Sequence, residues 1–135
     1  MKRLTFIAAA ALALLGCGDS RPAEGDGFIG ACSAVVNGCA ADAFVDATGG
    51  PVTIAFGVAG DTYDPRCVTV TAGQPVTFEG NFGFHPIAQT CGPVDAIPAT
   101  STGTSLTLTL TEGTYGYRCT VHGALGMVGA IRVVQ

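Results

Sequence analysis

Strict alternation of apolar and polar residues over 105–111 constrains the fold more than any other feature of this sequence. Leu106, Leu108 and Leu110 are separated by threonines. Because successive side chains of a β-strand point to opposite faces, this pattern predicts a strand with one buried and one exposed face. An α-helix would instead bury residues three or four positions apart. No stretch beyond the first sixteen residues has that helical period over three turns.

Other short runs rich in β-branched and aromatic residues are separated by Gly and Pro from about residue 43 onward. In addition to 105–111, they predict strands at 52–56, 67–71, 76–79, 114–119 and 129–134. In the run before the last strand, alternation places Tyr115, Tyr117 and Cys119 on one face, with the two tyrosines as core residues. Seven or eight strands in about 95 residues predict an all-β fold, an antiparallel Greek-key β-sandwich.

The N-terminal residues differ in composition from the rest of the chain. Residues 1–16 combine a short basic start with an apolar run, which predicts a secretory signal too short to span a bilayer stably. The run ends in Leu-Leu-Gly followed by Cys17, and this resembles the lipobox of bacterial lipoproteins, whose cysteine is acylated. The alternative is an ordinary signal peptide with a chance cysteine. We expect an exported protein, lipid-anchored at Cys17 in the bacterial cell envelope and facing the periplasm or the cell surface.

Residues 17–38 are rich in Gly, Ala and Asp without sustained periodicity. They predict a flexible tether between the lipidated Cys17 and a domain over 39–135, with the end of the tether from Cys32 onward bonded to the domain. Cleavage before Cys17 leaves four arginines against ten acidic residues, a net charge of about −6. This balance argues against nucleic-acid binding and favours a cationic protein partner.

The chain has six cysteines, an informative number for an exported protein. With Cys17 assigned to lipid, five remain, and in an oxidising compartment one thiol must stay unpaired. We assign that thiol to Cys119. The other four allow three disulfide connectivities, and spacing alone does not choose among them. The pairing we favour is Cys39 with Cys67 and Cys32 with Cys91.

Beyond the signal, the chain contains two histidines and one methionine. Together with Cys119, His85, His122 and Met127 offer one thiolate, two imidazoles and one thioether, a donor set that suits copper in a trigonal site with a weak axial methionine. Zinc accepts cysteine and histidine but rarely recruits methionine. Cys119, His122 and Met127 form the pattern C-x2-H-x4-M on one loop, and His85 lies 34 residues upstream of the cysteine. Ligands from two distant segments would hold an ion rigidly.

Two stretches around these residues resemble the plastocyanins and related cupredoxins. Residues 112–133 (EGTYGYRCTVHGALGMVGAIRV) resemble the C-terminal copper loop of that family. Residues 71–78 (TAGQPVTF), which lead to Phe-His-Pro at 84–86, are similar to its first-ligand region. The resemblance covers roughly residues 43–135.

This resemblance implies a cupredoxin-like sandwich that holds one type 1 copper ion through His85, Cys119, His122 and Met127. It also implies one-electron exchange through the exposed edge of His122, with redox proteins that dock transiently on a monomer. Two residues depart from the pattern. Arg118 stands where plant plastocyanins place an aromatic residue used in docking and electron entry, and strand alternation points it outward. Pro86 follows the first ligand where the family often has Asn, and Pro has no N–H to donate to the thiolate.

The donor set and the length of the chain distinguish four classes of function. An electron carrier without catalytic turnover needs a saturated site, which the four ligands provide. The alternative is a periplasmic copper-binding or copper-delivery protein, although such proteins use exposed, exchangeable ligands. An oxidase or reductase of this fold would need further domains and histidines, and a purely structural sandwich leaves Cys119 unexplained. We interpret Asp42, Asp46, Asp61 and Asp64 as turn and solvent-facing residues rather than a second metal site. Two interpretations are open for Pro86, Ala124 and Leu125: ordinary loop residues, or an apolar collar around His122 that suits transient docking.

Overall fold

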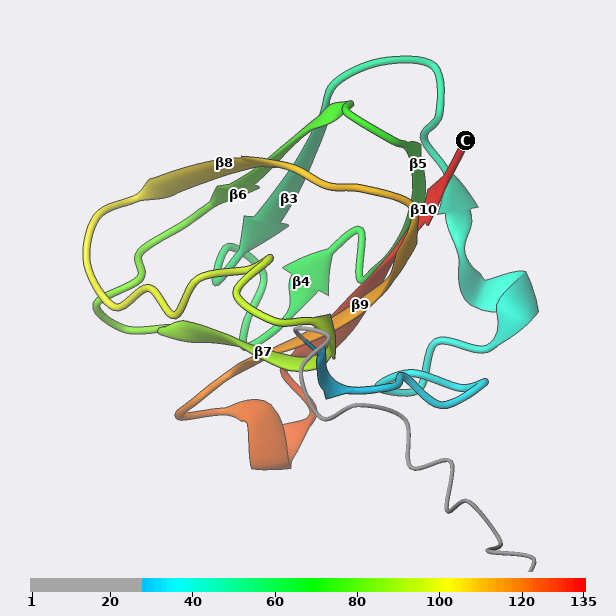
Figure 1. The fold of residues 1–135 in the computed structure, drawn as a ribbon. Helices are drawn as coiled ribbons and strands as arrows, with labels where there is room; N and C mark the ends of the chain where they lie inside the picture. The colour runs from blue at the N-terminus through cyan, green and yellow to red at the C-terminus, as the bar shows by residue number, and fades with distance from the viewer. Residues whose placement is uncertain (1–27) are drawn as a thin grey trace, which may run out of the picture.

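A computed structural model describes residues 28–135, so the predicted signal and Cys17 lie outside the described residues. The described part contains ten strands and two short 3₁₀ helices and forms two sheets packed face to face (Figure 1). The elements, in chain order, are β1 (Phe28–Gly30), η1 (Ala41–Ala43), β2 (Val45–Asp46), β3 (Val52–Phe56), β4 (Tyr63–Asp64), β5 (Cys67–Thr71), β6 (Pro75–Glu79), β7 (Ile87–Pro93), β8 (Ser105–Thr109), β9 (Gly113–Cys119), η2 (Gly123–Leu125) and β10 (Val128–Val134).

The strands form a six-stranded sheet in the order β1-β7-β9-β10-β5-β2 and a four-stranded sheet in the order β4-β3-β6-β8. The predicted all-β sandwich is thereby confirmed. The pairing is mixed rather than purely antiparallel as expected, because β5 pairs in parallel with both β10 and β2, and β3 pairs in parallel with β6. The strand number exceeds the predicted seven to eight because β1, β2 and β4 are only two or three residues long and carry no periodic signal.

The core lies between the sheets and is rich in aromatic residues. Tyr117 is fully buried and packs edge-on against Tyr63 and Phe78, with ring centroids 4.9 Å apart in both pairs. Such aromatic pairs contribute about 0.5–1.5 kcal/mol beyond the area that they bury. Cys119 and Met127 belong to the same buried cluster. Two predicted copper ligands are therefore part of the core.

The segment before η1 is attached to the six-stranded sheet. β1 pairs with β7, and disulfides join Cys32 to Cys91 and Cys39 to Cys67, the pairing favoured from the sequence. The Asn37 side chain donates hydrogen bonds to the carbonyls of Tyr117 and Gly129. The predicted tether over 17–38 therefore overlaps residues that are packed on the domain, and only its part before Phe28 lies outside the described residues.

Among residues 28–135, no helix is both long enough and apolar enough to cross a membrane. The loop between β9 and β10, which carries η2, projects from one end of the sandwich. In Figure 1 this loop, in orange, lies at the end opposite to the C-terminus of the chain.

Candidate metal centre

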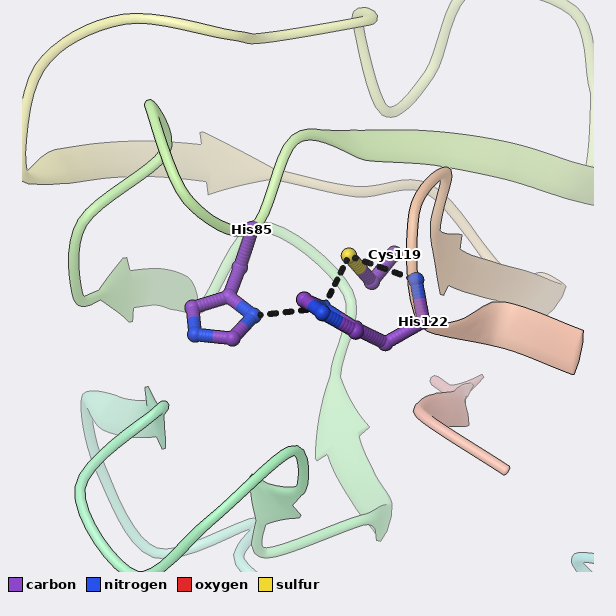
Figure 2. Close-up of side chains that lie close together, drawn as sticks. All are labelled: His85, Cys119 and His122. Atoms are coloured by element: carbon purple, nitrogen blue, oxygen red, sulfur yellow. Dashed lines mark hydrogen bonds between the residues drawn. The ribbon is translucent and has the colours of Figure 1, made fainter. Parts of the chain in front are cut away.

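His85, Cys119 and His122 converge at the end of the sandwich that carries η2. Their ligand atoms all lie within 4.8 Å of one another. Figure 2 shows a nitrogen of each imidazole ring directed toward the other ring, with the sulfur of Cys119 beside the ring of His122. His85 comes from the loop between β6 and β7, Cys119 is the last residue of β9, and His122 directly precedes η2. Two segments that are distant in sequence, the β6–β7 loop and the end of β9 with the loop that follows it, thus supply one cluster.

Two of the three donor separations in this cluster are short enough for a single ion. The Nδ1 atoms of His85 and His122 are 3.1 Å apart, and Sγ of Cys119 is 3.6 Å from Nδ1 of His122. Metal–imidazole bonds are about 2.0–2.1 Å long and metal–thiolate bonds about 2.3 Å, so donors on one ion must be less than about 4.4 Å apart. Both separations satisfy this limit. One thiolate and two imidazoles form the trigonal donor set typical of type 1 copper.

The backbone fixes the loops that carry these residues. Ile87, at the start of β7, is paired with Cys119, and the N–H of Thr120 donates to the carbonyl of Pro86 at 2.8 Å. The N–H of His85 donates to the carbonyl of Asn81 at 3.0 Å. The segments that carry His85 and Cys119 are therefore joined through main-chain hydrogen bonds of their neighbours. These bonds limit the rearrangement of the site.

The loop between β9 and β10 folds back on itself through His122. The carbonyl of His122 accepts hydrogen bonds from the N–H groups of Leu125 and Met127, at 2.9 and 3.1 Å. Gly126 has φ of +103°, a left-handed conformation that glycine adopts without a Cβ penalty. The carbonyl of Met127 then accepts the N–H of Cys119 at 2.9 Å, so Met127 is returned to a position opposite the cysteine. Its side chain is fully buried.

The environment of the thiol is dry and contains one backbone donor. Cys119 is fully buried, and the N–H of His122 donates to its Sγ at 3.4 Å. Pro86, as expected, offers no N–H. The hydroxyl of Tyr63 is buried and has no partner among the described residues. Burial raises the pKa of Tyr63 above its ordinary value, and the negative charge of Cys119 raises it further.

The two histidines differ in their access to solvent. The side chain of His122 is 25% exposed and that of His85 is 13% exposed. Four large apolar side chains are exposed in the loops that carry or contact these histidines: Val58, Phe84, Val121 and Leu125. Of the predicted collar, Ala124 and Leu125 are exposed and Pro86 is half-buried. Arg118 points outward as predicted, with its aliphatic carbons along Gly123.

Two neighbours of the site carry no signal in the sequence that links them to it. Asp61, read as a turn residue, has Oδ1 at 3.9 Å from Nδ1 of both His85 and His122. Gly57 lies against the imidazole of His85, where a Cβ atom would be 2.8 Å from Cδ2. Both belong to the loop between β3 and β4, which is distant in sequence from every predicted ligand. Only the fold brings this loop to the cluster.

Comparison with known proteins identifies similar chains. Residues 53–134 match the family described as copper binding proteins, plastocyanin/azurin family. Chloroplastic plastocyanin of Hordeum vulgare is 33% identical over 86 residues, which cover 53% of this chain and 54% of that protein. Plastocyanin A/B of Petroselinum crispum is 34% identical over 89 residues, covering 55% of this chain and 89% of that protein. This chain thus spans about half the length of the Hordeum vulgare relative, and most of the Petroselinum crispum one.

Solved structures of similar chains include two with 25% sequence identity. Oxidised plastocyanin from Dryopteris crassirhizoma aligns with 61% of this chain and 99% of its own, at a TM-score of 0.48. Dithionite-reduced auracyanin from Roseiflexus castenholzii aligns with 67% of this chain and 100% of its own, also at a TM-score of 0.48.

The family match covers more than half of the sequence and includes all four predicted ligands. It agrees with the cluster of one buried thiol and two imidazoles that the fold assembles. The chain therefore belongs to the plastocyanin/azurin family of copper-binding proteins.

Proposed function

We propose that this protein is a blue (type 1) copper protein that carries single electrons between redox partners at the cell envelope. The observation that carries the proposal is the convergence of His85, Cys119 and His122, with their ligand atoms within 4.8 Å of one another. In this proposal these three residues and Met127 hold the ion. When bound, copper supplies the one-electron Cu(I)/Cu(II) couple.

The residues of the chain would contribute rigidity and exclusion of water. Cys119 and Met127 are both fully buried, so their sulfur atoms are shielded from solvent. The hydrogen bond from Thr120 to Pro86 joins the loops that carry His85 and Cys119. A rigid, dry site favours electron transfer because little rearrangement accompanies each change of oxidation state. With all four donors supplied by the protein, no position is kept free for a substrate, as a catalytic metal site requires.

His122 is the residue through which we expect electrons to pass. Its side chain is more exposed than that of His85, while Cys119 is buried. Val121 and Leu125 are exposed on either side of it in sequence. An apolar surface of this kind suits a small and short-lived contact with a redox protein. We expect the protein to act as a monomer.

The site is tested by loading purified protein with Cu(II). We expect intense blue absorption from thiolate-to-copper charge transfer, and loss of this absorption in Cys119→Ser. A colourless copper-loaded protein, or one with only weak tetragonal Cu(II) features, would contradict the type 1 assignment. Repeated reduction and reoxidation in the presence of a Cu(I) chelator separates the two candidate functions. Retention of copper supports electron transfer, whereas ready loss of Cu(I) to the chelator supports copper delivery.

We infer the location of the protein from the sequence of the first 38 residues. A signal over 1–16 and acylation of Cys17 would place the domain on the outside of a bacterial membrane, at the end of a short tether. Fractionation of cells that express the full chain tests this. We expect the wild type in the membrane fraction and Cys17→Ala in the soluble fraction. Equal partition of both proteins would argue against the anchor.

A further inference from the structure

The loop between β3 and β4 places one carboxylate beside both histidines of the metal centre. Oδ1 of Asp61 lies 3.9 Å from Nδ1 of His85 and 3.9 Å from Nδ1 of His122. These are the two nitrogens that are 3.1 Å from each other in the cluster. Asp61 therefore faces the pair of imidazoles equally rather than belonging to one of them.

No positive side chain of the described part of the chain, residues 28–135, pairs with this carboxylate. Among residues 28–135, no arginine nitrogen lies within 4.0 Å of a carboxylate oxygen. In the same residues, the contacts within 4.0 Å between a carboxylate oxygen and a basic nitrogen are those of Asp61 with the two histidines. The Asp61 side chain is 49% exposed, so water screens its charge in part without removing it. The carboxylate is thus free to act on a cation held by the histidines.

Asp61 does not belong to the copper-binding cluster itself. The group whose ligand atoms all lie within 4.8 Å of one another consists of His85, Cys119 and His122 and does not include it. Its Oδ1 is close to the two imidazole nitrogens, but Asp61 does not join the group that contains the sulfur. Because the type 1 donor set is complete without it, Asp61 would act on a bound ion as a nearby charge, and an unchanged absorption band in Asp61→Asn distinguishes this role from that of a ligand.

We propose that Asp61 sets the reduction potential of the copper centre by favouring Cu(II) over Cu(I). This inference rests on the proposed function. Reduction adds one electron, supplied by a redox partner, and lowers the positive charge of the ion by one unit without moving a proton. A negative charge a few ångströms away stabilises the more highly charged ion more strongly. Asp61 therefore lowers the potential and makes the protein a weaker electron acceptor.

The experiment compares the midpoint potentials of copper-loaded wild type, Asp61→Asn and Asp64→Asn at neutral pH. Asn replaces Asp with almost the same shape and no charge. Asp64 is the matched control, because it is exposed on β4 of the same hairpin and is not within 4.0 Å of a histidine nitrogen. In Asp61→Asn we expect the ratio of Cu(II) to Cu(I) affinity to fall on the order of tenfold, a rise of about 59 mV. We expect the control to change much less.

The visible spectrum and the salt dependence complete the test. Two results for Asp61→Asn support a charge acting through space: the blue absorption band is unchanged, and the rise in potential is smaller at high ionic strength. An equal rise in both variants, no rise, or a changed absorption band in Asp61→Asn overturns the inference. A wild type without blue absorption would overturn the proposed function and this inference together. A blue wild type whose potential is unaffected by Asp61→Asn overturns the inference alone.

Discussion

Gly57 lies directly against the imidazole of His85. A Cβ atom at Gly57 would be 2.8 Å from Cδ2 and 2.9 Å from Nε2 of that ring, closer than real Cβ contacts allow. The φ angle of Gly57 is +70°, in the left-handed region that residues with a Cβ rarely adopt. The absence of a side chain at residue 57 is therefore what lets the loop between β3 and β4 close over His85, the first predicted copper ligand.

We predict that Gly57→Ala weakens copper binding. The added methyl group must displace either the loop or the His85 ring, and loss of support for a metal-ligating histidine lowers metal affinity by roughly 10–100-fold. Competition against a Cu(II) chelator measures this affinity. The matched control is Gly60→Ala in the same loop, since its φ is +110° but nothing lies within 4 Å of its Cβ position. Both variants should lose stability through strain, and equal copper affinities in the two would refute the prediction.

The sequence predicts the copper ligands because chemistry and spacing single them out. Cys119 is the thiol left over by the disulfide count, and His122 follows it at a fixed interval in a glycine-containing loop. The involvement of Asp61 and Gly57 could not be predicted in this way. The sequence Gly-Asp-Thr predicts an ordinary turn. Only the packing of the β3–β4 hairpin against residues 85 and 122 places it beside the two histidines.

The fold is predicted well where the alternation of side chains is undisturbed. The expected strands at 52–56 and 67–71 coincide with β3 and β5. β7 could not be predicted, because Gly92 and Pro93 interrupt its apolar pattern, and it is a strand through its pairing with β9. The parallel pairs were also beyond prediction, since parallel and antiparallel strands have the same side-chain period of two.

Replacing Met127 by Leu should separate the role of its sulfur from the role of its bulk. Leu fills nearly the same volume, so the fully buried position should lose less than about 1.5 kcal/mol of stability. We expect the variant to bind copper and remain blue, with a higher reduction potential because a weak donor to Cu(II) is lost. Spectroelectrochemical titration measures the potential. An unchanged potential would show that Met127 is a core residue and not a ligand.

The two disulfides should differ in their contribution to stability. Their sequence separations of 28 and 59 residues correspond to loop-closure terms of roughly 3.6 and 4.2 kcal/mol, which favour the longer loop of Cys32 and Cys91. However, Cys39 and Cys67 are buried in a small apolar cluster, whereas Cys32 and Cys91 are only partly buried against it. Substituting alanine for Cys39 and Cys67 would remove the cross-link that restricts the unfolded chain and would also leave a cavity in the folded protein.

We therefore predict a larger loss of unfolding free energy for the double substitution of Cys39 and Cys67 by Ala than for that of Cys32 and Cys91. Guanidinium unfolding of the two double variants measures the difference. Both should still bind copper, because neither bond includes a ligand. A larger loss in the variant without the Cys32–Cys91 bond would mean that chain entropy outweighs packing at these positions.

Two buried tyrosines should make the protein less stable in alkali. Burial raises the pKa of Tyr117 well above its ordinary value of 10.0, and burial followed by the charge of Cys119 raises that of Tyr63. Above pH 10 the unfolded chain releases these protons while the folded chain retains them. The stability contribution is thus complete below pH 10 and is lost as the pH rises from there toward the raised pKa values. The loss approaches about 1.4 kcal/mol per tyrosine for each pH unit.

The corresponding variants are Tyr63→Phe and Tyr117→Phe in a Cys119→Ser background, where no free thiol among the described residues can exchange with the disulfides. At neutral pH, Tyr117→Phe should cost about 1 kcal/mol, because the Tyr117 hydroxyl donates to the carbonyl of Arg66 at 3.2 Å. Tyr63→Phe should cost less or stabilise, since that hydroxyl has no partner among the described residues. Between pH 9 and about 11, each substitution should flatten the fall in unfolding free energy with pH. A variant with both substitutions is the last control. If its unfolding free energy fell with pH as steeply as that of the parent, the alkaline loss of stability would have to arise from groups other than these two hydroxyls.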